Sequence, residues 1–136
     1  MVATMPTDVF FDTNILLYLT SKDLKRIATS ERLVGAGGLV SVQVLNEIAR
    51  VLSGKMNFSW VEVGEFLTSI RAKCFTVPLT IETHERGLAY AERYRLGVYD
   101  GTIVAAAVIA GCKTLYSEDM HHGLKIDGLT VKNPYR

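Results

Sequence analysis

The amino-acid sequence predicts an α/β protein, a three-layer α/β/α sandwich with a central parallel sheet. Short β-rich runs alternate with longer stretches of helical periodicity along the chain, which is the pattern of a parallel sheet with helices on both faces. The chain has 136 residues, of which 49% are hydrophobic and 21% charged, enough for a hydrophobic core in a globular protein. No repeat, low-complexity segment or linker interrupts the pattern, so we expect a single domain over residues 1–136.

The first half of the chain contains two predicted strands and three predicted helices. The run "DVFF" (8–11) predicts a short buried strand, and the apolar residues at 15–19 predict the first turns of a helix. Helical spacing at 24–34 predicts a second helix, which ends in a glycine-rich segment. "LVS" (39–41) predicts the second strand, and "VQVLNEIARVLS" (42–53) predicts an amphipathic helix that Gly54 ends.

The second half continues the alternation. "SWVEVGEFLTSIRA" (59–72) opens with a capping box from Ser59 to Glu62 and predicts a helix. "CFTVPL" (74–79) predicts the third strand, "KTLYS" (113–117) the fourth and "LTVKN" (129–133) a fifth. Between them, "DGTIVAAAVIAG" (100–111) predicts a buried helix that begins at Asp100. The helix that starts at Thr80 has a predicted buried stripe of Ile81, His84, Leu88, Ala91 and Tyr94.

Composition excludes several classes of protein. The formal net charge is +1, so nucleic-acid binding would have to come from local groups of charge. Cys74 and Cys112 lack CxxC or His spacing, which is typical of reduced, buried thiols rather than a disulfide or a zinc site. "MVATMPT" lacks the regions of a secretory signal, and the longest apolar run, "IVAAAVIAGC", is far shorter than the ~20 residues that span a bilayer. We therefore expect a cytoplasmic protein without a membrane partner.

Four carboxylates lie at predicted element ends or beside buried faces. Asp12 ends the first strand, and Asp119 lies two residues beyond Ser117 at the end of the fourth. Sites in open α/β sheets form at these carboxyl ends. Glu47 lies beside the apolar stripe of its helix, and Asp100 begins the most apolar helix. We refer below to the four acids, meaning Asp12, Glu47, Asp100 and Asp119.

Each acid also has a purely structural explanation. Asp12 and Asp100 can cap the helices that follow them, Asp119 can hold a turn, and Glu47 can be a half-exposed helix residue. If the four acids converge, however, their like charges raise one another's pKa values. Mg²⁺, which prefers oxygen ligands, would relieve this repulsion. Such a site suits phosphodiester cleavage by a metal-activated water.

Four segments resemble, in order, the motifs of the PIN domain family, and within it the VapC-type ribonuclease toxins of toxin–antitoxin pairs. These segments are "FFDTNILLY", "SVQVLNEIARVL", "VYDGTIVAAAVIAGC" and "TLYSEDMHHGLKIDGLTVKNP". The resemblance covers about residues 8–134 and implies a PIN-like parallel α/β/α sandwich. It implies a Mg²⁺- or Mn²⁺-dependent endoribonuclease that acts on RNA. It also implies a homodimer inhibited by a cognate antitoxin protein.

The resemblance also implies roles for individual residues. The four acids would form the metal site, with Asn14 and Ser117 as polar supports that orient them. Thr13 would occupy the family's small polar position and have a structural role. One departure is Gly101, which stands after Asp100 where the family often has alanine, and glycine in a first helical turn is mildly unfavourable.

Other readings of the same residues remain open. Asp12 could be the nucleophile of a phosphatase or phosphotransferase, although Asn14 stands where the haloacid-dehalogenase type has a second aspartate. The chain could also be a non-catalytic phosphoacceptor or binding module, although the late-strand lysine of receiver proteins is missing from "TLYSED". His121 and His122 are expected to be loop residues, because Mg²⁺ prefers oxygen ligands. Strand alternation is expected to turn Glu118 away from Asp119.

Overall fold

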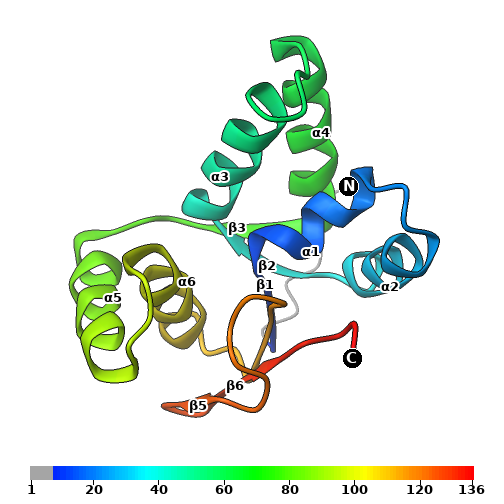
Figure 1. The fold of residues 1–136 in the computed structure, drawn as a ribbon. Helices are drawn as coiled ribbons and strands as arrows, with labels where there is room; N and C mark the ends of the chain where they lie inside the picture. Colours follow the sequence, from blue (N-terminus) through cyan, green and yellow to red (C-terminus); the bar gives the residue numbers. More distant parts are fainter. Residues whose placement is uncertain (1–7) are drawn as a thin grey trace.

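The computed structural model describes residues 8–136, and a six-stranded sheet of order β3-β2-β1-β4-β6-β5 runs through them (Figure 1). The neighbours from β3 to β6 pair in parallel, and β5 pairs antiparallel with β6. The predicted central parallel sheet is therefore confirmed, with one antiparallel edge strand that the sequence did not predict. The strands are β1 (Val9–Phe11), β2 (Gly38–Ser41), β3 (Cys74–Val77), β4 (Thr114–Tyr116), β5 (Lys125–Ile126) and β6 (Leu129–Lys132).

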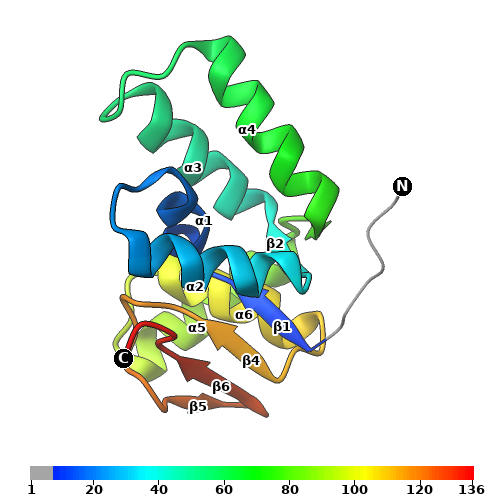
Figure 2. The same ribbon diagram turned by 90° about the vertical axis from the view of Figure 1, so that its right-hand side faces the viewer.

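Helices cover both faces of this sheet, as predicted. Helices α1 and α2 lie on one face and α5 and α6 on the other, while α3 and α4 form a hairpin that extends beyond the β3 side (Figures 1 and 2). The helices are α1 (Thr13–Leu17), the 3₁₀ turn η1 (Tyr18–Thr20), α2 (Leu24–Gly35), α3 (Val42–Ser53), α4 (Trp60–Lys73), α5 (Ile81–Tyr94) and α6 (Val98–Ile109).

The unpredicted strand β5 depends on a tight turn. Asp127 and Gly128 join β5 to β6, and both have positive φ angles, 46° and 88°. An Asp-Gly pair in this conformation matches the twist of a β-hairpin. Because β5 has only two residues, its own sequence carries too little periodicity to predict a strand.

The buried face of α5 differs from the predicted stripe. Its buried residues are Thr83, Gly87 and Tyr90, whereas Ile81 is 74% exposed and His84 is also exposed. A Cβ added at Gly87 would lie 2.8 Å from the Cα of Thr102 in α6. The two helices therefore pack through small residues, and a stripe chosen for hydrophobicity misses that face.

Helix α6 begins earlier than predicted. Gly97 is its N-cap, so Asp100 lies inside the first turn and does not cap the helix. A carboxylate in the first turn is still favoured by the helix dipole. A Cβ added at Gly101 would clash with the carbonyl oxygen of Gly87 and approach Ala91 to 3.1 Å. Glycine at this position thus permits the close approach of α5 and α6.

The capping box of α4 is confirmed. The Ser59 hydroxyl accepts from the Glu62 backbone, and Glu62 accepts from the Ser59 backbone. Both cysteines are free and buried, as predicted. None of the helices in residues 8–136 has the length and apolar character that crossing a bilayer requires. The interpretation of "MVATMPT" concerns residues 1–7, which lie outside the described residues.

Candidate active site

The site residues gather where the connections of the sheet change direction. Strand β1 pairs with β2 on one side and with β4 on the other. The chain therefore continues from β1 to β2 and β3 on one side and later adds β4 on the opposite side of β1. The carboxyl ends at such a switch point are where α/β folds bind ligands. Asp12 follows β1 directly, and Ser117 follows β4.

Asp12 is buried and held by two hydrogen bonds. Its side chain is only 3% exposed. Oδ1 accepts from the Thr13 backbone N–H at 2.7 Å, which caps α1, and Oδ2 accepts from Ser117 Oγ at 2.7 Å. The pKa of Asp12 is raised to about 7. Burial is the largest cause, the two hydrogen bonds oppose the shift, and the nearby charges of Asp100 and Asp119 add to it.

Thr13 connects Asp12 to Glu47. Its hydroxyl donates to Glu47 Oε2 at 2.8 Å, while its backbone N–H donates to Asp12. One residue therefore positions carboxylates from two elements, β1 and α3. The sequence had assigned Thr13 only a structural role, and this contact gives that role a specific geometry.

Asn14 performs the corresponding task for Asp119. Its Nδ2 donates to Asp119 Oδ2 at 2.8 Å. The bond spans from α1 to the loop after β4, so it ties together two segments that are 105 residues apart in sequence. The segment Asp12-Thr13-Asn14 thus contains one of the four acids and hydrogen-bonds two others, Glu47 and Asp119.

Asp100 completes the group electrostatically. It lies half-buried in the first turn of α6. Burial raises its pKa, and the negative charges of Asp119 and Glu47 raise it further. Asp12 responds to the charges of Asp100 and Asp119. The four acids are therefore electrostatically coupled, although they come from four separate parts of the chain.

The donor set has the chemistry of a site for a hard divalent cation. Carboxylate and hydroxyl oxygens are the ligands that Mg²⁺ prefers, and no cysteine or histidine is needed to complete the set. Within residues 8–136, no group of three or more His, Cys, Asp or Glu side chains is already arranged to hold an ion. Asp12, Glu47 and Asp119 instead accept hydrogen bonds from neighbouring polar groups.

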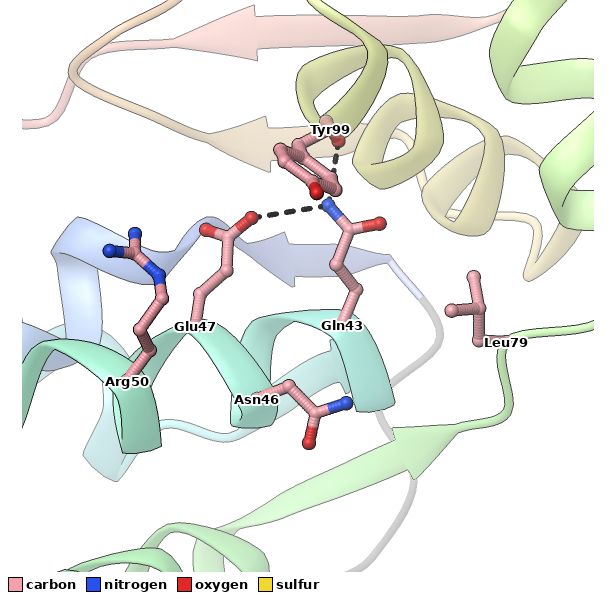
Figure 3. A pocket seen from close by; sticks show the side chains of 6 residues that line it. All are labelled: Gln43, Asn46, Glu47, Arg50, Leu79 and Tyr99. Atoms are coloured by element: carbon pink, nitrogen blue, oxygen red, sulfur yellow. Dashed lines mark hydrogen bonds between the residues drawn. The ribbon is translucent and has the colours of Figure 1, made fainter. Parts of the chain in front are cut away.

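Gln43 belongs to the site and was missed by sequence reasoning. Its side-chain nitrogen donates to Glu47 Oε1 at 3.3 Å and to the Tyr99 backbone oxygen at 2.9 Å (Figure 3). It is only 7% exposed and joins α3 to the turn that carries Asp100. An available signal was its position four residues before Glu47, which places both side chains on one face of the helix.

Two other polar residues of this loop, Glu118 and His122, have partners outside the four acids. Glu118 accepts hydrogen bonds from Tyr18 and Arg26, and the Arg26 guanidinium also lies over the rings of Tyr18 and Tyr135. His122 Nδ1 accepts from the Asn133 backbone N–H at 3.0 Å. These contacts hold the loop and the C-terminal segment in place.

The chain is similar to several solved structures. A chain of a toxin–antitoxin complex from Klebsiella pneumoniae has a TM-score of 0.73 at 20% identity, covering 94% of this chain and 98% of that one. VapC20 from Mycobacterium tuberculosis, a Sarcin–Ricin loop cleaving toxin, has a TM-score of 0.67 at 20% identity, with 82% and 90% covered. VapBC2 from Rickettsia felis, bound to a DNA fragment from its promoter, has a TM-score of 0.67 at 18% identity, with 96% and 98% covered. These likenesses show the fold.

No curated protein matches the sequence. The sequence model of the PIN domain, in contrast, matches residues 9–123. That match runs from the first residue of β1 through the loop that carries Asp119, and so includes all four acids. Because the match spans most of the chain, this protein belongs to the PIN domain family.

Proposed function

We propose that this protein is a divalent-metal-dependent endoribonuclease and the toxin of a VapBC-like toxin–antitoxin pair. The observation that carries the proposal is the convergence of acids from separate elements at the switch point of the sheet. Hydrogen bonds of Thr13 and Asn14 join Asp12, Glu47 and Asp119 there, and the charges of Asp119 and Glu47 act on Asp100. Burial of Asp12 beside other carboxylates makes its ionised form unfavourable, and a bound cation offsets this cost. A polar oxygen-rich site without a cysteine, histidine or lysine nucleophile favours metal-assisted hydrolysis over covalent catalysis.

The chain's own residues would hold the ion and orient the acids. Asp12, Glu47, Asp100 and Asp119 would hold Mg²⁺ or Mn²⁺, which supplies a Lewis acid for the phosphoryl oxygen and lowers the pKa of an attacking water. Ser117 and Thr13 keep Asp12 in one orientation. Asn14 restrains Asp119 in the same way. Such supporting contacts are what fix the geometry of metal ligands.

The names of the similar structures support the choice of substrate and partner. VapC20 is named as a toxin that cleaves the Sarcin–Ricin loop, and two further similar structures are VapBC complexes bound to DNA. By extension, we assign to this chain an RNA substrate and a cognate antitoxin protein. The homodimeric state that we also assign rests on the resemblance to VapC-type toxins alone.

The phosphatase alternative is less well supported. An acid/base residue two positions after Asp12 would have to exchange a proton, but Asn14 carries an amide that donates to Asp119. A receiver-like phosphoacceptor would need a lysine at the end of a late strand that reaches the acids. Lys113 precedes β4, and Lys132, which ends β6, is exposed.

The test is cleavage of RNA by purified, antitoxin-free protein with Mg²⁺, with Mn²⁺ and with EDTA. Cleavage that requires the ion, and that Asp12→Asn abolishes while a Glu31→Gln control on the exposed face of α2 retains it, supports the proposal. Wild-type protein that is folded but inert towards total RNA with either ion contradicts it. Induced expression in cells gives a second readout, since the wild type should arrest growth and Asp12→Asn should not.

A further inference from the structure

A cavity of about 340 Å³ has Glu47, one of the four acids, in its wall. Its volume lies at the lower end of the range for small-ligand pockets, about 300–1,000 Å³. Glu47 belongs both to the wall of this cavity and to the four acids, so an occupant would lie next to the candidate metal site. We call it the α3 pocket, and its lining residues are Gln43, Asn46, Glu47, Arg50, Leu79 and Tyr99 (Figure 3).

One face of α3 supplies most of the polar wall. Gln43, Asn46, Glu47 and Arg50 follow the spacing i, i+3, i+4 and i+7, which places them in one stripe. Gln43 uses its amide nitrogen inside the protein, on Glu47 and on the Tyr99 backbone. Gln43 is therefore a support for the wall, and it fixes Tyr99 relative to α3.

Arg50 and Asn46 are available to a ligand. No side-chain hydrogen bond or ion pair is found for either residue in the described part of the chain, and both are exposed. Arg50 lies one helical turn beyond Glu47 and forms no salt bridge with it (Figure 3). A guanidinium presented in this way suits a phosphate group. The Asn46 amide offers both a donor and an acceptor, the pair that reads a base edge.

Tyr99 and Leu79 supply the apolar part of the pocket. Tyr99 is 70% exposed and Leu79 is 46% exposed, so neither is used by the core. Tyr99 precedes Asp100 in α6, and the bond from Gln43 to its backbone oxygen fixes the backbone from which its ring extends at the wall of the pocket. An exposed aromatic ring on a fixed backbone is a platform on which an unstacked base can lie.

We propose that the α3 pocket binds one unstacked nucleotide of single-stranded RNA next to the cleaved phosphodiester, with its base on Tyr99, its phosphate on Arg50 and its base edge on Asn46. This inference rests on the proposed ribonuclease function and adds to it a nucleotide-binding subsite with named residues. Only a single-stranded or extruded nucleotide can lay its base on Tyr99, because the bases of a duplex are already stacked.

Binding is tested without cleavage by fluorescence titration of a labelled single-stranded oligoribonucleotide in EDTA. Tyr99→Ala should weaken binding about five- to a hundredfold, and Tyr99→Phe should bind as the wild type does, because only the ring is needed. Trp60→Ala is the matched control, since Trp60 is 74% exposed on α4 and lies outside the pocket. A blunt RNA duplex should bind more weakly than the single strand and should be insensitive to Tyr99→Ala.

Arg50→Ala and Asn46→Ala test the remaining two contacts. Arg50→Ala should reduce the slope of log binding constant against log salt by about 0.7, the value for one phosphate contact on a single strand. Arg32→Ala, the same charge change in α2, should leave the slope unaltered. Asn46→Ala should reduce the difference in affinity between homo-oligomers, such as oligo(A) and oligo(U), because the contact to the base edge is lost. Thermal melting confirms that each variant is folded.

The outcomes distinguish a failure of the α3 pocket as a nucleotide subsite from a failure of the proposed ribonuclease function. If the wild type cleaves RNA while Tyr99→Ala and Arg50→Ala bind and cleave as it does, the α3 pocket is not a nucleotide subsite and the ribonuclease proposal stands. If the wild type binds the oligomer through Tyr99 but cleaves no RNA with either ion, the subsite stands and the ribonuclease proposal fails.

Discussion

The hydroxyl of Ser117 lies 2.7 Å from Oδ2 of Asp12 and donates a hydrogen bond to it, across the carboxyl ends of the paired strands β4 and β1. The same hydroxyl accepts from the Met120 backbone N–H, so it also anchors the loop that carries Asp119. Removal of the Ser117 hydroxyl should therefore affect both the charge state of Asp12 and the placement of Asp119.

Ser117→Ala should shift the pH dependence of RNA cleavage to higher pH. The hydrogen bond from Ser117 lowers the pKa of Asp12, so its loss leaves burial less opposed and a higher pH is needed to ionise the acid. Cleavage rates measured across pH with saturating Mg²⁺ test this. Ser69→Ala, which removes an exposed hydroxyl from α4, is the control, and equal profiles for the two variants would contradict the assigned role.

Metal-free protein should lose stability as pH rises, through Asp12. Its pKa is 3.8 in the reference state and about 7 in the fold, so between these values the folded chain holds a proton that the unfolded chain releases. The stabilising contribution is fully present below pH 3.8 and is lost as pH rises through about 7. Asp12→Asn removes this dependence and should become more stable than the wild type at about pH 8, on the order of a few kcal/mol.

Urea unfolding in EDTA at about pH 5 and about pH 8 measures this difference. The free energy of unfolding of Asp12→Asn relative to the wild type should increase with pH. Glu31→Gln in α2 should show a constant offset from the wild type. A pH-independent difference between Asp12→Asn and the wild type would show that burial does not perturb the acid in the way described.

Divalent cations should raise the melting temperature of the wild type at about pH 8. An ion that binds only the folded chain stabilises it by about 2.7 kcal/mol at a concentration one hundred times its dissociation constant. Asp12→Asn and Asp100→Asn should each lose most of this gain, because each removes a charged oxygen ligand. Calorimetry with MgCl₂ or MnCl₂, against NaCl of equal ionic strength, separates binding from screening. An equal response of all three proteins would place the ion elsewhere.

Gly101→Ala should destabilise the protein by about 1–3 kcal/mol, because the added Cβ clashes with the Gly87 carbonyl of α5. The clash should also move the first turn of α6, and with it Asp100, so the affinity for Mg²⁺ should fall. Gly64→Ala in α4 is the matched control, since nothing lies within 4 Å of its Cβ. That substitution should stabilise the helix by about 0.5–1 kcal/mol. Similar melting shifts for the two variants would contradict the packing argument.

Much of the fold could be predicted because its elements have clear local signals. The capping box at Ser59 and Glu62 and the amphipathic stripe of α3 are properties of a few adjacent residues. The buried face of α5 could not be predicted in the same way. It is chosen by close contact of Gly87 with Thr102, a partner in another helix, and glycine carries no hydrophobic signal.

The candidate site divides in the same way. Strand ends and helix starts are readable along the chain, so Asp12, Asp100 and Asp119 could be nominated from sequence. Gln43 could not, because its importance comes from a bond to the Tyr99 backbone 56 residues away. The α3 pocket likewise depends on α3, the loop after β3 and α6 meeting in space.

The sequence by itself determined the alternation of strands and helices, the four acids and their polar neighbours, since each is a local pattern or a residue type. Only the tertiary structure decided which hydroxyl or amide holds each acid, how closely α5 approaches α6, and which exposed ring lies beside Glu47. The physical reason is that hydrogen bonds, steric contacts and desolvation act over a few ångströms between atoms that the fold brings together. Their strength depends on that distance, and separation along the chain does not encode it.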